Sequence, residues 1–245
     1  MNPEAELRRA IVEISRLLYE RKLVVATDGN VSARLDRKHI LITPSGFCKG
    51  FLREPDIVRI VIPETDSPPR TPRPLGKEVG RVHHQGTKTP RNLHLEGWDA
   101  AGEPGLSRAK IGDSPQTGTV PIFAPISAGA SSETPMHLAV YQARPDIAAV
   151  IHAHPPYATS FAVSGHKLNH KLLPETHLFD GPIGRVPFLK AGSTRLAQAV
   201  ALVLKSHRLC LLARHGAVTT GKTLLEAYYR LERLEFLAQV SATAR

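Results

Sequence analysis

The sequence has no long hydrophobic run, few cysteines and few aromatic residues. No uninterrupted apolar stretch approaches the about 18 residues that a membrane-spanning helix needs, so no such helix is expected. Two cysteines, Cys48 and Cys210, are too few for a disulfide framework, which favours a reducing, cytoplasmic setting. Charged side chains run through the N-terminal apolar stretch, so we expect no secretory signal there.

The chain is basic, with 32 Lys and Arg against 22 Asp and Glu and a net charge of +10. The basic residues are scattered, and only 5 Tyr, 7 Phe and 1 Trp are available to stack on nucleic-acid bases. We therefore expect neither a nucleic-acid nor a membrane partner. A basic surface of this kind suits a small phosphorylated substrate.

Proline and glycine are concentrated in the middle of the chain. Residues 63–130 hold 10 of the 20 prolines and 9 of the 18 glycines, and they show almost no hydrophobic periodicity. Such a stretch offers too little apolar surface to offset the entropy lost on ordering. We therefore predict one domain over residues 1–245 that carries an atypical, poorly ordered insert at residues 63–130.

Regular hydrophobic patterns flank this segment. Apolar residues recur at helical spacing, or fill short runs with helix-start signals, over residues 4–21, 132–143, 156–164, 196–205 and 223–240. Short apolar runs predict strands at residues 31–35, 39–43, 147–154 and 209–213. Helices and strands alternate without a strict βαβ rhythm, which indicates an α/β or α+β domain.

Three histidines lie at the ends of predicted strands. His152 and His154 close the strand at residues 147–154, and residues two apart in a strand project to the same face. An isolated His-x-His is more often a pair of unrelated polar residues, but His215 also follows an apolar strand. Three neutral imidazoles with an open position form a catalytic zinc site, although such a site also accepts Mn²⁺, Co²⁺ or Fe²⁺.

A carboxylate and two serines lie at the start of a predicted helix. Glu133 is a candidate fourth ligand or general base, and Ser131 and Ser132 lie where the positive end of the helix attracts phosphate. A simple helix cap is the alternative for the two serines. Residues 26–30 and 43–46 form glycine-bearing turns that can cradle phosphate, or that can be ordinary turns.

Residues 216–223 match the phosphate-loop pattern G-x-x-x-x-G-K-[ST] of nucleotide-binding proteins. Only 22 residues follow Thr223, which leaves no room for the further strands of a nucleotide-binding core. The β-branched residues inside the match also favour a strand over a wrapping loop. We therefore interpret the match as coincidental.

Four separated stretches together resemble the class II aldolase/adducin family: ATDGNVSARL, ILITPSGFCKG, SSETPMHLAVYQARPDIAAVIHAHPPYATSFA and LLARHGAVTTGKTLLEAY. The resemblance implies an α/β single domain with a central, mainly antiparallel sheet flanked by helices, assembled as a homotetramer. It also implies a zinc-dependent lyase of carbohydrate metabolism that cleaves a small, fuculose-1-phosphate-like ketose phosphate. Retro-aldol cleavage through a metal-stabilised enediolate gives dihydroxyacetone phosphate and an aldehyde.

The same resemblance implies roles for individual residues. His152, His154 and His215 hold Zn²⁺, and Glu133 is the acid/base. The residues implied to bind the substrate phosphate, or to shape the loop that does so, are Thr27, Gly29, Asn30, Ser45, Gly46, Ser131 and Ser132.

Other activities on the same fold are an epimerase, a dehydratase, a decarboxylase or an inactive adducin-like scaffold. Glu133 favours the aldolase over the epimerase, whose relatives carry Asp at this position, and the three histidines argue against a scaffold. Aldolases of the family use a tyrosine from the neighbouring subunit. Residues 168–185 contain no tyrosine, so the candidates to replace it are His170, Glu175 and His177.

Overall fold

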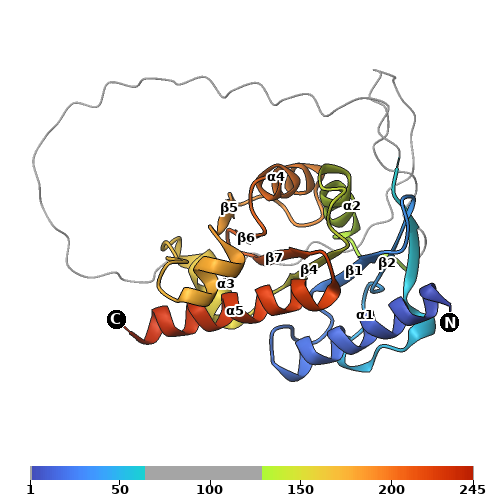
Figure 1. Cartoon of the computed structure of the whole chain (residues 1–245), viewed down its shortest axis with the longest axis horizontal. Helices are drawn as coiled ribbons and strands as arrows, with labels where there is room; N and C mark the ends of the chain where they lie inside the picture. Colours follow the sequence, from blue (N-terminus) through green and yellow to red (C-terminus); the bar gives the residue numbers. More distant parts are fainter. Residues whose placement is uncertain (1, 64–128, 245) are drawn as a thin grey trace, which may run out of the picture. The chain divides into compact units, whose positions relative to one another are not determined.

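A seven-stranded sheet organises residues 2–63 and 129–244, the part of the chain that this computed structural model describes (Figure 1). Its strands are β1 (Asn30–Arg34), β2 (His39–Ile42), β3 (Val58–Val61), β4 (Ala149–Ala153), β5 (Gly184–Val186), β6 (Leu209–Leu212) and β7 (Gly216–Gly221). They lie in the order β3-β2-β1-β4-β7-β6-β5, and every neighbouring pair is antiparallel except β5 and β6. The predicted α/β fold with a mainly antiparallel sheet is confirmed.

Helices cover both faces of the sheet. They are α1 (Pro3–Glu20), α2 (Thr134–Ala143), α3 (Pro156–Ser164), α4 (Thr194–Leu204) and α5 (Leu224–Thr243). Figure 1 shows α1, α3 and α5 on one side of the sheet and α2 and α4 on the other. Neighbouring residues of β4 enter different cores: Ile151 packs in the core on the α1 side, and Val150 packs in the core on the α2 side. The central strand is apolar in both directions because both of its faces are covered.

Each helix and strand predicted from the sequence has a counterpart in the structure, with ends shifted by a few residues. Two strands, β3 and β5, have no clear sequence signal. In β3 only Ile60 is buried, because the strand lies at the edge of the sheet, and β5 has only three residues. Three short helices also have no clear sequence signal: η1 (Lys49–Phe51), η2 (Glu54–Asp56) and the π-helical η3 (Thr176–Asp180). No helix in the described ranges is long and apolar enough to cross a membrane.

Both ends of the predicted insert are tied to the sheet-bearing unit. At one end the Pro63 carbonyl accepts a hydrogen bond from Gln142 Nε2 at 2.9 Å. At the other end the Gly129 carbonyl accepts the Ser45 N–H at 2.8 Å, and Ala130 pairs with Pro44. The rest of the insert lies outside the described residues, so the predicted domain organisation stays a prediction. These contacts fix the chain where it leaves β3 and where it enters α2.

Candidate active site

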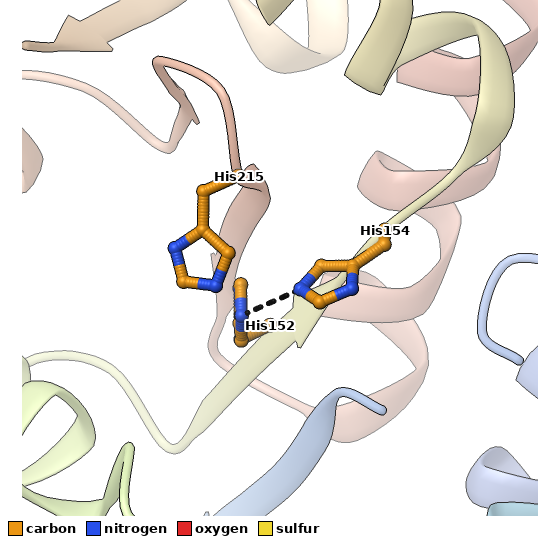
Figure 2. Close-up of side chains that lie close together, drawn as sticks. All are labelled: His152, His154 and His215. Atoms are coloured by element: carbon orange, nitrogen blue, oxygen red, sulfur yellow. Dashed lines mark hydrogen bonds between the residues drawn. The ribbon is translucent and has the colours of Figure 1, made fainter. Parts of the chain in front are cut away.

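Three imidazoles meet at one end of β4 and β7 (Figure 2). His152 belongs to β4, His154 follows its last residue, and His215 lies in the turn between β6 and β7. Antiparallel pairing aligns Ala153 with Ala217, so the end of β4 lies beside the start of β7. One nitrogen from each ring lies within 4.8 Å of the other two. The expectation that the three histidines come together is therefore met by the fold.

Hydrogen bonds select which ring nitrogen faces the centre of the cluster. His152 Nδ1 lies 3.0 Å from the Ala217 carbonyl, which can only accept, so Nδ1 carries the hydrogen and Nε2 keeps a free lone pair. His154 Nδ1 lies 3.5 Å from the Asp28 carboxylate, which selects the same form of that ring. The two Nε2 atoms are 3.2 Å apart. Tetrahedral Zn–N bonds of about 2.0–2.1 Å place two nitrogens about 3.4 Å apart, so the donor set fits a divalent cation.

Burial keeps the rings of His152 and His215 neutral, which is the form that binds a metal. Burial and, as a smaller effect, repulsion from His215 and His154 hold the pKa of His152 well below its usual range. Burial and the neighbouring His154 lower the pKa of His215 to about 4. At neutral pH the nitrogens are thus available as ligands without first losing a proton.

Glu133 lies immediately before α2, with only 7 % of its surface exposed. Its Oε2 atom is buried and has no hydrogen-bond partner among the described residues. Burial raises the pKa of this carboxyl, an effect that the backbone N–H of Gly192 partly offsets. A buried carboxylate oxygen without a partner is costly, so this atom suits a proton or a cation that arrives with the substrate or cofactor.

The segment before α2 lies against the strand next to the histidines. Asn30 Nδ2 donates to Ser131 Oγ at 2.7 Å, and Asn30 is the cross-strand neighbour of His152. Ser131 Oγ also accepts the Glu133 N–H at 3.3 Å. Glu133 itself is the N-cap of α2, and no side-chain hydrogen bond caps this helix, so the structure does not bear out the helix-cap alternative for the serines. Asn30 and Ser131 thereby connect the predicted phosphate-binding residues to the histidine cluster.

The other predicted phosphate-binding residues line the surrounding turns. Thr27 and Ser132 are exposed, and so are both Ser45 and Gly46 in the turn after β2. The N–H of Ser45 is already donated to Gly129, so only its hydroxyl is available to a ligand. Gly29 lies beneath the site, against the backbone of His152. The structure therefore groups Asn30, Ser131 and Gly29 tightly and leaves the other predicted residues on the turns.

A domain-level comparison matches residues 9–100 and 110–242 to the Class II Aldolase and Adducin N-terminal domain. The chain belongs to the class II aldolase and adducin family. It is 30% identical over 233 residues to the L-fuculose phosphate aldolase of Methanococcus vannielii, an alignment that covers 95% of this chain and 94% of the relative. It is 26% identical over 240 residues to a 3-oxo-tetronate 4-phosphate decarboxylase of Haemophilus influenzae, covering 96% and 87% of the two chains.

Among solved structures, the L-fuculose-1-phosphate aldolase of Thermus thermophilus matches with a TM-score of 0.68 and 25% identity, covering 98% of this chain and 95% of that one. The predicted family is thus confirmed. Its named relatives are lyases of two kinds, aldolases and decarboxylases, so membership in the family indicates a lyase without fixing the substrate.

The phosphate-loop match is a strand in this class II aldolase fold. Residues Gly216–Gly221 form β7, which pairs with β4 on one side and β6 on the other. Its backbone N–H groups belong to the sheet and cannot wrap a phosphate. The interpretation of the match as coincidental is correct.

Several residues near the site were missed by sequence analysis. Lys49 is buried, and its ammonium donates to the carbonyls of Thr27 and Phe47, which joins the two glycine-bearing turns. Burial lowers the pKa of Lys49 to about 8. Ser32, His137 and Tyr141 are buried polar residues behind Asn30. The available signal in the sequence was that these polar side chains stand at positions whose spacing predicts burial in the core.

The candidate replacements for the family's tyrosine lie on the connection between α3 and β5. Glu175 is exposed there, and the rings of His170 and His177 lie 5.5 Å apart. Their part in the reaction stays a prediction.

Gly29→Ala is expected to destabilise the protein and weaken its metal binding. Gly29 has φ +71°, and an added Cβ would lie 2.8 Å from the His152 carbonyl oxygen and 2.8 Å from Val24 Cγ1. Left-handed backbone costs a non-glycine residue about 1–2 kcal/mol, and overpacking adds about 1–3 kcal/mol. Because the clash is with the backbone of a ligand histidine, we also expect a shift in metal affinity, measured by chelator competition.

Gly165→Ala is the matched control, because Gly165 has φ +74° and open space around the added Cβ. It should show the backbone cost alone in urea unfolding. Equal losses of unfolding free energy in the two variants would contradict the close approach at Gly29.

Proposed function

We propose that this chain is a divalent-metal-dependent lyase that cleaves a carbon–carbon bond of a small ketose phosphate by retro-aldol chemistry. The products are dihydroxyacetone phosphate and an aldehyde. The observation that carries this proposal is the convergence of His152, His154 and His215 with their ligand atoms within 4.8 Å. The 30% identical L-fuculose phosphate aldolase supports a fuculose-1-phosphate-like substrate.

The three histidines are the residues that hold the cation, with zinc as the favoured metal because imidazole nitrogens in a tetrahedral set suit it. The chemistry that a bound divalent cation supplies is Lewis-acid polarisation of the carbonyl and hydroxyl oxygens and stabilisation of the enediolate charge. Asp28 and the Ala217 carbonyl orient His154 and His152 for this task.

Glu133 supplies the proton transfers in this proposal. Cleavage requires a proton to leave the C4 hydroxyl as the C3–C4 bond breaks, and a proton to reach C3 of the enediolate. A carboxyl group whose pKa is raised by burial can hold a proton in one step and release it in the other. Its Oε2 atom, which has no hydrogen-bond partner in the described part of the chain, is assigned to hold that proton.

The phosphate group is assigned to Asn30, Ser131, Ser132, Thr27, Gly29, Ser45 and Gly46. Asn30 and Ser131 present polar hydrogens from a rigid, buried position. Lys49 adds positive charge behind the two turns that carry the other residues. The family's homotetramer is also proposed for this chain.

A decarboxylase is the second candidate, because the Haemophilus influenzae relative aligns with 96% of this chain. Loss of CO₂ from a 3-oxo acid phosphate generates the same kind of enediolate without removing a hydroxyl proton. The same histidines would serve both reactions, so the substrate decides between them.

Product analysis separates the two activities. The purified protein, loaded with Zn²⁺, is incubated with L-fuculose 1-phosphate and, separately, with 3-oxo-tetronate 4-phosphate. Dihydroxyacetone phosphate and aldehyde from the first substrate, abolished by a chelator and restored by metal, support the aldolase. Release of CO₂ from the second substrate alone supports the decarboxylase, and metal-bound protein that converts neither would contradict both proposals.

A further inference from the structure

A continuous row of buried polar side chains runs from the core of α2 to the candidate phosphate site. Tyr141 OH lies 3.0 Å from Ser32 Oγ, and Ser32 Oγ lies 2.7 Å from His137 Nδ1. His137 Nε2 lies 3.1 Å from Asn30 Oδ1, and Asn30 Nδ2 lies 2.7 Å from Ser131 Oγ. All five residues are at most 6% exposed. Water cannot replace a missing partner in such a row, so each donor must meet an acceptor.

The Asn30 amide fixes the direction of the row. Its oxygen faces His137 and can only accept, so His137 Nε2 carries the ring hydrogen. The neutral ring then has an acceptor at Nδ1, which the Ser32 hydroxyl fills. Ser32 Oγ in turn accepts the hydrogen of Tyr141 OH. Burial lowers the pKa of His137 to about 3, so this neutral ring persists throughout the neutral pH range.

The last member of the row is left with one group to offer. Ser131 Oγ accepts from Asn30 Nδ2 at 2.7 Å and from the Glu133 N–H at 3.3 Å, which occupies both of its lone pairs. The hydroxyl hydrogen of Ser131 is the group that remains for a ligand, and it can bind only a hydrogen-bond acceptor. The oxygens of a phosphate group are strong acceptors, and a hydrogen bond to a charged group is worth more than a neutral one.

We infer that His137 is a positioning residue that, through Asn30, makes Ser131 an obligate hydrogen-bond donor to the substrate phosphate. This inference rests on the proposed function, because it assigns a cause to phosphate binding at that same site. If His137 could not donate to Asn30, the amide could turn over. Ser131 would then donate to the amide oxygen, and its hydroxyl hydrogen would no longer be available to the phosphate.

Two substitutions of His137 separate this role from simple core packing. The amide nitrogen of glutamine reaches the position of the imidazole Nε2, so His137→Gln retains a donor to Asn30. The shorter amide of His137→Asn reaches only the position of Nδ1, so this variant loses that donor. Both variants place a smaller polar side chain in the same buried space, so they are a matched pair.

The probe is inorganic phosphate, titrated into the metal-loaded protein by calorimetry. We expect His137→Asn to weaken phosphate binding by about 10- to 100-fold, and His137→Gln to stay within about threefold of the unaltered protein. Metal content should be equal in all three proteins. For a substrate that is turned over, KM should rise in His137→Asn and kcat should change little.

Asn30→Asp is a second variant in case His137→Asn does not fold. Aspartate keeps the shape of asparagine but cannot donate, so Ser131 would donate to it and phosphate binding should fall at least as far. Equal phosphate affinities in His137→Gln and His137→Asn would overturn the inference, and so would normal affinity in Asn30→Asp.

Calorimetry requires no turnover, so the inference and the proposed function can fail separately. Protein that binds phosphate in the expected order but cleaves no ketose phosphate would support the inference and overturn the proposed reaction. Unaltered, metal-loaded protein that does not bind phosphate would overturn the inference.

Discussion

His152→Ala is expected to abolish stoichiometric metal binding and to lower turnover by roughly 10³-fold or more, because Lewis-acid stabilisation is worth several kcal/mol. His152 is fully buried between two neighbouring strands, and its Nε2 faces His154 at 3.2 Å. Removing one of three imidazoles leaves a two-ligand site that holds a divalent cation weakly. The metal content of the purified protein, measured by elemental analysis, should fall from near one metal per chain to a small fraction.

A half-buried ligand provides a second test, because a cavity in place of the His152 ring also destabilises the core. His154 is partly exposed, so His154→Ala should lose metal with less effect on the thermal midpoint. His166 is exposed on the segment after α3, and His166→Ala should retain both metal and turnover. Full metal occupancy in His152→Ala and His154→Ala would overturn the proposed site.

Glu133→Gln is expected to lower kcat by about 10²- to 10⁴-fold while metal content stays unchanged. Glutamine has the shape of glutamate but cannot take up and release the proton that the reaction moves. Oε2 of Glu133 is buried and has no hydrogen-bond partner among the described residues. A neutral amide costs less than a carboxylate to bury in such a place, so we expect no large loss of unfolding free energy. Steady-state kinetics on the substrate identified by product analysis measures the effect.

Glu13→Gln, on the exposed part of α1, controls for the change of charge and should leave kcat unaltered. Turnover of Glu133→Gln within tenfold of the unaltered protein would remove Glu133 from the proton transfers. A parallel loss of metal would instead make Glu133 a ligand of the cation.

The histidine cluster could be predicted from the sequence because its geometry is local. Residues two apart in a strand share a face, and this places His152 and His154 together. His215 could be added because it also ends a strand, although its position beside the other two depends on the pairing of β4 with β7. The phosphate-binding residues were named through the family resemblance, and for all of them the contacts with a substrate stay a prediction.

Lys49 shows why other parts of the site escaped prediction. A lysine next to a glycine, here at the start of η1, is typical of a solvated charge, yet its ammonium donates to the carbonyls of Thr27 and Phe47. No pattern in the sequence records that two turns more than a dozen residues apart fold over the same side chain. Edge strands such as β3 were missed for a related reason, since a strand that buries only Ile60 carries almost no periodic signal.

The sequence by itself determined the helices and the central strands, the mainly apolar interior and the kinds of side chain at the site. Those features follow from short-range periodicity and from the chemistry of single residues. Only the tertiary structure decided which nitrogen His152 and His154 present and which way the row from Tyr141 to Ser131 donates. Ser32 and His137 are 105 positions apart, and Asn30 and Ser131 are 101 apart. The direction of their hydrogen bonds depends on polar atoms that meet only when water is excluded from a folded core.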